Sequence, residues 1–234
     1  MNIKGFAKTT LLDYPGHIAS TIFTGGCNFN CPYCHNGDLV LDFHNMSNIS
    51  EQEVLTHIKK RSSIIDGICI SGGEPTLQHD LLDFMEKVKF YNLKIKLDTN
   101  GSNPHIIKQA YENNLVDYIA MDIKNSKQKY SVTCDKNINI DKIQQSIDYI
   151  IDCGINYEFR TTIVKEFHTE NDIIEIGKWL NGSKQYFLQQ YVERDKQIKE
   201  GLHSHNENTI LEYAQIVKPY FQNVSIRGID PQNL

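Results

Sequence analysis

Three cysteines share one short segment of the chain, Gly25-Gly26-Cys27-Asn28-Phe29-Asn30-Cys31-Pro32-Tyr33-Cys34-His35-Asn36. Their spacing is Cys-x-x-x-Cys-x-x-Cys, and the Gly, Asn and Pro residues around them favour a loop. Residues 18–23, just before this segment, are mostly apolar or β-branched, which is typical of a strand. We therefore expect a strand that ends in a loop carrying the three thiols.

Thiolates this close together favour a soft metal, either zinc or an iron–sulfur cluster. Structural zinc needs a fourth ligand, usually from a second Cys or His pair, and no such pair follows in the sequence. His35 directly follows Cys34 and is poorly placed to reach the same ion, so it either tunes the centre by hydrogen bonding or lies at the surface. Three thiolates on a four-iron cluster would leave one iron open to a small molecule. We favour the cluster; zinc and a disulfide-prone loop are the alternatives.

The composition is typical of a single soluble domain. The chain has 234 residues, 40% of them apolar, and a net charge of −5, which allows one sizeable core. The negative balance argues against general nucleic-acid binding, no apolar run approaches the roughly 18 residues of a membrane span, and the N-terminus lacks a signal peptide's apolar stretch. We expect a cytoplasmic protein without nucleic-acid or membrane partners. Its single domain would cover residues 1–234, with a lead at 1–17 and a helix and short strand at 207–234.

Three further cysteines, Cys69, Cys134 and Cys153, stand apart from the cysteine segment. No pair among them has the spacing of metal ligands. Disulfides are rare in a reducing compartment, whereas small buried thiols are common in cores. We therefore expect these three to be unligated structural thiols, and we expect no second cluster.

Strand and helix patterns alternate along the chain, which predicts parallel βαβ units with right-handed crossovers. A closed eight-stranded barrel takes about 250 residues. Six units therefore predict an α/β fold with a partial (β/α)6 TIM-like barrel, open on one side; a doubly wound sheet is the alternative. After the strand at 18–23, strands are expected at 66–71, 93–97, 117–124, 156–164, 185–190 and 224–227, and helices at 51–62, 81–88, from 104, and at 140–151, 169–181 and 207–218.

Polar residues gather at the carboxyl ends of the expected strands. In a parallel barrel these ends meet at one rim, so we expect the polar residues to share one site. Gly72 and Gly73 can present backbone groups to a ligand, and Glu74 offers a carboxylate to an ammonium group, although such a motif is often only a strand-to-helix turn. Besides the cysteines, the set comprises Ser71, Gly72, Gly73, Glu74, Asp98, Thr99, Asn100, Asp122, Lys124, Arg160, Gln189 and Gln190.

The charged members of this set allow more than one interpretation. The oxygens of Asp98, Thr99 and Asp122 suit an alkali or alkaline-earth cation or a ribose, and they equally suit caps and turns. Lys124 is either a solvated charge or, pointing inward, a partner for a carboxylate. Arg160 lies in an apolar strand, where an unpaired charge is costly. It is therefore either paired within the protein or bound to an anion.

Together these motifs resemble those of the radical S-adenosylmethionine (SAM) enzymes, and in particular the glycyl-radical-enzyme activases. The resemblance covers nearly the whole chain. It is strongest with the activating proteins of anaerobic ribonucleoside-triphosphate reductase, which are relatives of the pyruvate formate-lyase activating enzymes. The matching stretches are Leu11-Leu12-Asp13-Tyr14-Pro15-Gly16, the segment from Gly26 to Asn36, Ser71-Gly72-Gly73-Glu74-Pro75-Thr76, Leu97-Asp98-Thr99-Asn100-Gly101, Met121-Asp122-Ile123-Lys124 and Leu188-Gln189-Gln190-Tyr191.

The resemblance implies two cofactors, a [4Fe-4S] cluster and SAM. It further implies a monovalent cation against the SAM carboxylate, at Asp98, Thr99 and Asp122. No catalytic residue is implied beyond the cluster and SAM. The implied cluster ligands are Cys27, Cys31 and Cys34. The implied SAM contacts are Tyr33 (beside the adenine), Ser71, Gly72, Gly73, Glu74 (with the methionyl amine), Asp98, Thr99, Asn100, Asp122, Lys124 and Gln190.

The resemblance also implies a reaction. Activases of this kind take an electron from a flavodoxin or ferredoxin, cleave SAM reductively and generate a glycyl radical on a partner enzyme. Two departures from the lyase activase favour anaerobic ribonucleoside-triphosphate reductase as that partner. Tyr14 replaces a Gly in the lyase activase's Asp-Gly-Pro-Gly turn, and residues 189–192 replace its Pro-Tyr-His stretch. Asp13 and Tyr14 are candidates for receiving the partner's loop, because we expect their turn to lie close to the cysteine loop.

Other functions fit parts of the pattern. One is activation of a lyase-type glycyl radical enzyme. Another is a radical SAM reaction on a small molecule or RNA, although the lack of a basic excess disfavours RNA. A third is an iron–sulfur electron carrier, which would leave the motifs at residues 72–74 and 98–99 without a role.

Overall fold

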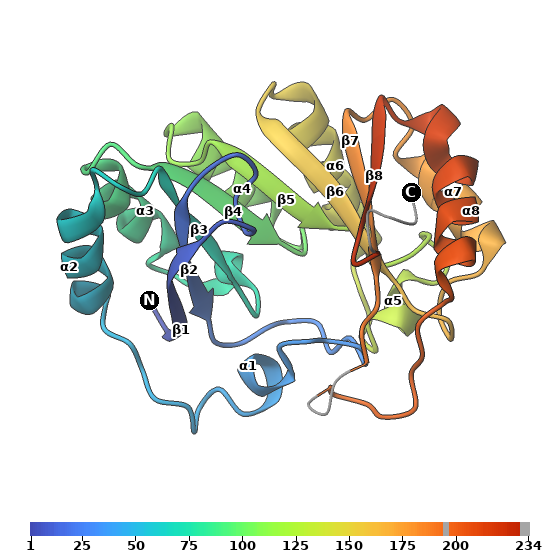
Figure 1. Cartoon of the computed structure of the whole chain (residues 1–234), viewed down its shortest axis with the longest axis horizontal. Coiled ribbons are helices and arrows are strands. Elements are labelled where there is room, and N and C mark those ends of the chain that lie inside the picture. The colour runs from blue at the N-terminus through green and yellow to red at the C-terminus, as the bar shows by residue number, and fades with distance from the viewer. Residues whose placement is uncertain (194–196, 230–234) are drawn as a thin grey trace.

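The computed structural model describes residues 1–193 and 197–229. In this part of the chain one curved sheet has eight strands, and its strand order follows the sequence (Figure 1). Residues 230–234, the end of the segment predicted at 207–234, lie outside the described residues. The strands are β1 Ile3–Thr10, β2 Ala19–Thr24, β3 Gly67–Gly72, β4 Lys94–Thr99, β5 Tyr118–Asp122, β6 Asn156–Ile163, β7 Gln185–Gln190 and β8 Asn223–Arg227.

The sheet is a partial barrel. Strands β2 to β8 run parallel to one another, and β1 and β8 are the two edges of the sheet. A doubly wound sheet reverses its strand order at a switch point, whereas here each strand lies beside the preceding one. Strands β2 to β7 are each followed by a helix. The predicted partial (β/α)6 barrel is therefore confirmed.

Strand β1 was not predicted, because the sequence analysis treated residues 1–17 as a lead without a strand. It pairs antiparallel with β2, with Ile3 opposite Thr24 and Thr10 opposite Ala19, and two irregularities interrupt the register. Only Ile3 is buried among its residues. The alternation of apolar and polar residues that marks a half-buried strand is therefore missing from its sequence.

The longer helices lie within a few residues of their predicted positions. At the start of α2, the Ser50 hydroxyl accepts a hydrogen bond from the Glu53 amide at 3.1 Å. In the described ranges, no helix combines the length and apolar character needed to cross a membrane. The longer helices are α2 Glu51–Arg61, α3 Leu81–Lys89, α4 Pro104–Glu112, α6 Ile140–Asp152, α7 Glu170–Trp179 and α8 Glu207–Val217. The short helices, which were not predicted, are α1 Gly37–Leu41, α5 Tyr130–Thr133, η1 Pro75–Leu77 and η2 Lys218–Tyr220.

Alternate residues of each strand face two different environments, because side chains of a strand point in turn to opposite faces. The outer face of the sheet is apolar and lies against the helices (Figure 1); Ile70 and Leu97 are fully buried there. The next residues along the same strands, Ser71 and Asp98, point into the barrel and bond to each other at 3.0 Å. The apolar core is therefore outside the barrel, and the barrel interior is polar.

An ion pair joins the edge strand β8 to the barrel interior. The Arg227 guanidinium donates two hydrogen bonds to the fully buried Glu158 carboxylate, at 2.8 and 2.9 Å. Tyr118 on β5 donates a third, at 2.9 Å. The Arg227 guanidinium also lies 3.6 Å from the centre of the Phe187 ring. Strand β8 is thus attached to β6 across the intervening β7.

We predict that Glu158→Gln lowers the free energy of unfolding by about 2 kcal/mol, because it replaces the fully buried carboxylate that accepts the hydrogen bonds of the Arg227 guanidinium with a neutral amide. Urea denaturation followed by circular dichroism measures this change. The matched control is Glu175→Gln, which breaks a 2.7 Å ion pair with Lys178 on the surface of α7. That pair is exposed to solvent, so its loss should cost much less than the loss of the Glu158 carboxylate. Equal losses for the two variants would contradict a special role for the buried pair.

Candidate functional site

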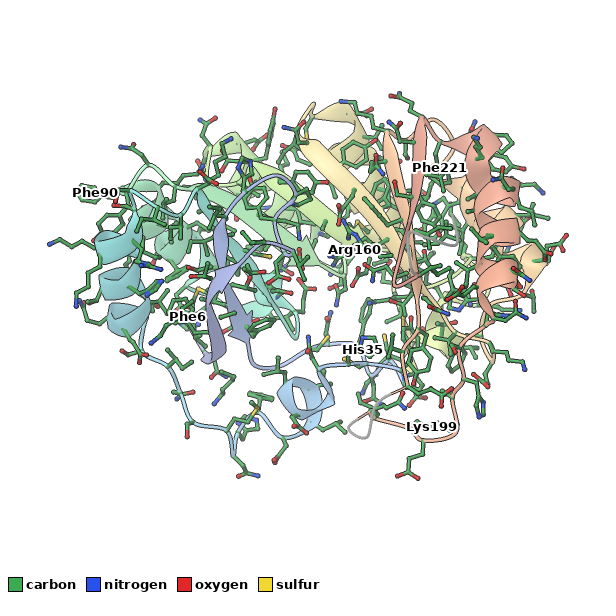
Figure 2. The ribbon with its side chains drawn as sticks, viewed as in Figure 1. Phe6, His35, Phe90, Arg160, Lys199 and Phe221 are labelled. Carbon is green, nitrogen blue, oxygen red and sulfur yellow. The ribbon has the colours of Figure 1, made fainter. Side chains whose placement is uncertain are left out.

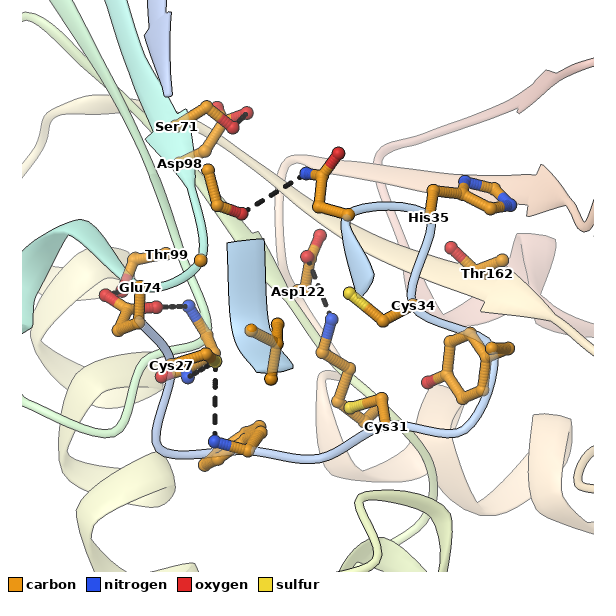
Figure 3. Close-up of a pocket in the computed structure, with 18 of the residues that line it drawn as sticks. Cys27, Cys31, Cys34, His35, Ser71, Glu74, Asp98, Thr99, Asp122 and Thr162 are labelled. Atoms are coloured by element: carbon orange, nitrogen blue, oxygen red, sulfur yellow. Dashed lines mark hydrogen bonds and ion pairs between the residues drawn. The ribbon is translucent and has the colours of Figure 1, made fainter. Parts of the chain in front are cut away.

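The carboxyl ends of the strands surround one cavity of about 220 Å3, which opens to solvent (Figure 3). The sequence-predicted residues that line it are Cys27, Cys31, Tyr33, Cys34, Ser71, Gly72, Gly73, Glu74, Asp98, Thr99, Asn100, Asp122, Lys124, Arg160 and Gln189. Others that line it are Phe29, His35, Asn36, Val40 and Thr162.

Backbone hydrogen bonds tie the cysteine loop to the glycine-rich turn after β3. The Glu74 amide donates to the Gly26 carbonyl at 2.8 Å, and the Gly73 amide donates to the Thr24 carbonyl at 2.8 Å. A Cβ at position 73 would lie 2.1 Å from the Gly26 carbonyl oxygen. Gly72 has φ +121°, a conformation that L side chains rarely adopt. Both glycines are therefore required for the close approach of the two loops.

The three thiols face this cavity from a largely buried loop. Cys31 is buried, and Cys27 and Cys34 are partly buried. Burial and the nearby Glu74 together raise the pKa of Cys27 to about 12; burial also raises the pKa of Cys34. Cys27 and Cys34 therefore lose their protons readily only to a metal centre. Within the described ranges, no three Cys, His, Asp or Glu side chains converge on a single-ion site.

The Glu74 carboxylate is fully buried and carries four hydrogen bonds. Oε1 accepts from the Thr76 amide and hydroxyl and from the Thr99 hydroxyl, at 2.6–3.1 Å. Oε2 accepts from the Asn100 amide at 2.6 Å. Burial raises the pKa of Glu74, and these donors oppose that rise. The carboxylate therefore joins the ends of β3 and β4, and it is the backbone of the turn that is available to a ligand.

Two aspartates at the ends of β4 and β5 are paired with cations of the protein. Arg160 on β6 donates from Nε to Asp122 Oδ1 at 2.8 Å, and its NH1 lies 3.4 Å from Asp98 Oδ2. Lys124 Nζ is 3.0 Å from Asp122 Oδ2, and Lys96 bonds to Asp98 Oδ1. Burial acts to raise the pKa of both carboxyls, but the cations outweigh it, and both pKa values are lowered. Arg160, at the centre of the barrel in Figure 2, is thus paired within the protein.

Two residues of this region were not predicted. Lys96 lies in an apolar strand, where only its spacing of two from Asp98 marks it as facing the same side. Thr162 lines the cavity from β6, and the predicted Gln189 lines it from β7. Gln190, which was predicted to contact SAM, is not among the lining residues; its side chain donates to the His205 carbonyl at 3.3 Å. Neighbouring residues of a strand point to opposite sides, so only one of this glutamine pair can face the cavity.

Asp13 and Tyr14 lie away from the cysteine loop, so the predicted proximity is wrong. Tyr14 is buried against Tyr118, the first residue of β5, with ring centres 5.9 Å apart. Asp13 accepts a hydrogen bond from Thr21 at 2.5 Å. These contacts place the turn toward the amino ends of the barrel strands, opposite the rim that carries the cysteines. Turn chemistry predicts the local bend but not the end of the barrel at which it lies.

An aromatic cluster forms one wall of the cavity. Tyr33 is buried, and its ring packs near Phe167 and Tyr191, with centres 5.8 and 6.5 Å apart. Its hydroxyl has no hydrogen-bond partner among the described residues. His35 stacks on Tyr191, with ring planes 9° apart. An orphaned buried hydroxyl beside the cavity is a group that a bound ligand would satisfy.

The three separate cysteines are Cys69, Cys134 and Cys153. Cys69 and Cys134 are fully buried and Cys153 is partly buried. All six cysteines of the chain are free of disulfides. The disulfide-prone loop considered for the cysteine segment is therefore absent from the structure.

The cavity has the features that a [4Fe-4S] cluster and SAM require. Three thiols supply soft ligands for iron. A glycine-rich turn exposes backbone groups, Lys124 offers a partly buried ammonium group, and Tyr33 offers an aromatic ring with an unpaired hydroxyl. The residues therefore fit both cofactors.

Comparison with known proteins agrees with this geometry. The sequence profile of the radical SAM superfamily matches residues 21–180. A Methanocaldococcus jannaschii protein described as a putative glycyl-radical enzyme activating enzyme is 34% identical over 235 residues, which cover 97% of this chain and 96% of that protein. A pyruvate formate-lyase-activating enzyme of Clostridium pasteurianum is 28% identical over 127 residues, 52% of each chain.

Solved structures share the fold. A domain of a pyruvate-formate lyase-activating enzyme from Bacteroides vulgatus superposes with a TM-score of 0.56 at 19% identity, covering 69% of this chain and 99% of that domain. The protein is thus an enzyme, and its cofactors are a [4Fe-4S] cluster and SAM, as predicted. The chain belongs to the radical SAM superfamily and, within it, to the family of glycyl-radical-enzyme activating enzymes.

Proposed function

We propose that this enzyme cleaves SAM reductively and generates a glycyl radical on anaerobic ribonucleoside-triphosphate reductase. The observation that carries the proposal is that three thiols, a glycine-rich turn and the paired charges of β4, β5 and β6 line one cavity. An electron carrier would need the thiols alone. The similarity to an activating enzyme over 97% of the chain supports a reaction on a partner enzyme.

The proposed roles follow from the position of each residue. Cys27, Cys31 and Cys34 hold the cluster. When bound, the cluster and SAM supply the electron and the carbon–sulfur bond that the reaction breaks. The backbone at Gly73 binds the methionyl amine, and the Lys124 ammonium group orients the methionyl carboxylate. The low exposure of the thiols restricts water at the cluster.

The open side of the barrel supports a protein substrate. The edges β1 and β8 lie at opposite ends of the sheet order and leave the barrel incomplete. A glycine within a folded partner must enter as a loop, and an incomplete barrel admits a loop more easily than a closed one. We propose a flavodoxin or ferredoxin as the electron donor and the cytoplasm as the compartment, since reduced clusters and free thiols persist under reducing conditions.

A second candidate is activation of a pyruvate formate-lyase-type enzyme, and the partial match to the Clostridium pasteurianum protein favours it. Two sequence differences favour the reductase instead. Tyr14 stands where the lyase activase carries a Gly, and residues 189–192 replace its Pro-Tyr-His stretch. The two partners are separated by the experiment below.

The reconstituted enzyme, supplied anaerobically with SAM and dithionite, should form 5′-deoxyadenosine. Cys31→Ala should reduce this product to the level seen without dithionite, because one iron ligand is lost. The matched control is Cys153→Ala, a partly buried thiol at the end of α6, which should keep wild-type turnover. Product formation is measured by chromatography. Unchanged turnover in Cys31→Ala would refute the assignment of the ligands.

The partner is tested by electron paramagnetic resonance. Incubation of the enzyme, SAM and reductant with anaerobic ribonucleoside-triphosphate reductase should yield a glycyl radical signal. The same mixture with a pyruvate formate-lyase-type enzyme should yield none. A signal with the lyase alone would establish the second candidate.

Gly73→Ala should lower the rate of SAM cleavage by about a hundredfold, because the added Cβ forces the turn about 1 Å away from the cysteine loop, and a misplacement of that size can cost this factor. The clash is with backbone, at 2.1 Å from the Gly26 carbonyl oxygen. The control is Gly5→Ala on β1, where the Cβ meets only the Phe23 side chain, at 3.1 Å. Wild-type rates in Gly73→Ala would contradict the required close approach.

A further inference from the structure

Each carboxylate oxygen of Asp98 and Asp122 already faces a cationic group of the protein. Lys96 bonds to Asp98 Oδ1, and Lys124 Nζ lies 3.0 Å from Asp122 Oδ2. Arg160 serves the other two oxygens, at 3.4 Å from Asp98 Oδ2 and 2.8 Å from Asp122 Oδ1. The Ser71 hydroxyl adds a bond to Asp98 Oδ2 at 3.0 Å. All four carboxylate oxygens of the two aspartates are therefore already paired with a cationic side chain of the protein.

The monovalent cation implied by the family resemblance does not fit this arrangement. A metal cation at these aspartates needs several free oxygen ligands. Here it would lie beside Lys96 and Arg160, and like charges repel strongly in a buried site. The Thr99 hydroxyl, the third implied ligand, is occupied as a donor to Glu74 at 2.8 Å and accepts from the Gly101 amide at 3.1 Å.

Lys96 differs from the other two cations in its position. Its side chain is 3% exposed, and it does not appear among the residues that line the cavity. Its only other close polar neighbour among the described residues is Cys69 Sγ, at 3.8 Å. Lys96 thus supplies a positive charge to Asp98 from the barrel interior, on the side away from the ligand.

We propose that Lys96 takes the place of a monovalent cation, so that this enzyme binds SAM without one. Lys96 is a positioning residue: with Ser71 and Arg160 it fixes the Asp98 carboxylate at the end of β4, next to Thr99 and Asn100, which hold Glu74. The inference rests on the proposed position of SAM in this cavity. It predicts that SAM binding by the wild type is independent of the monovalent cation, which the proposed function alone does not predict.

The first test uses the wild-type protein with its cluster reconstituted anaerobically. The dissociation constant of SAM is measured by equilibrium dialysis in potassium, sodium or choline chloride at equal ionic strength. A change of the cluster's electron paramagnetic resonance signal on SAM addition is the second readout. We expect the three constants to agree within about twofold, well under the tenfold that corresponds to about 1.4 kcal/mol.

The second test removes the charge with Lys96→Met. In choline we expect SAM to bind about tenfold more weakly, the loss of one charge-assisted interaction, and we expect potassium to restore much of the affinity. Lys96→Arg keeps the charge and should remain independent of the cation. The matched control is Lys94→Met, an exposed lysine two positions earlier on the same strand, which should bind SAM as the wild type does.

Each outcome decides between named alternatives. If the wild type binds SAM at least about fivefold more tightly in potassium than in choline, the inference is overturned and the proposed function remains intact. Lys96→Met with wild-type binding in choline would also overturn it. No SAM binding in any salt would overturn the proposed site itself. If Lys96→Met does not fold, the wild-type salt series alone decides.

Discussion

A single buried carboxylate holds the rim of this barrel together. Glu74 takes four hydrogen bonds from the turn after β3 and the end of β4, and its own amide binds the carbonyl of Gly26 at the start of the cysteine loop. Three segments distant in sequence thus meet at one residue. Because an unsatisfied buried charge is costly, the carboxylate is stable only when all of them are in place. The thiols and the ligand-binding turn therefore acquire their positions together.

The barrel reverses the usual distribution of polarity. Its outer face carries the apolar core, with Ile70 and Leu97 against the helices, whereas its interior holds ion pairs around Arg160. Buried ion pairs add little net stability, because desolvation offsets their attraction. They do impose geometry, since each charge is stable in only one arrangement of its partners. The interior thus fixes the carboxyl ends of β4, β5 and β6, where the cofactors are proposed to bind, and the outer core supplies the stability.

The sequence predicted the features that depend on local pattern. Alternating strand and helix segments predicted the barrel, and the ends of its strands predicted most residues around the cavity. Features that depend on distant partners were not predicted. Strand β1 pairs through its backbone while its side chains, apart from Ile3, are only partly covered. Lys96 was not predicted, because its pairing with Asp98, to which Arg160 also bonds, depends on side chains from two strands meeting inside the barrel. Tyr14 lies in a recognisable turn, but its place at the amino ends of the strands depends on its contact with Tyr118.

The ion pair between Glu158 and Arg227 also bears on the synthesis of the chain. Domains form as units during synthesis, amino-terminal parts first, and Arg227 lies in β8, 69 residues after Glu158. Until that strand has emerged, the Glu158 carboxylate lacks its bidentate partner, and burying it so is unfavourable. The release of β8 from the ribosome therefore controls when β6 and β7 can reach their final positions. The cysteine loop follows β2 and is synthesised before the strands that complete the barrel around it.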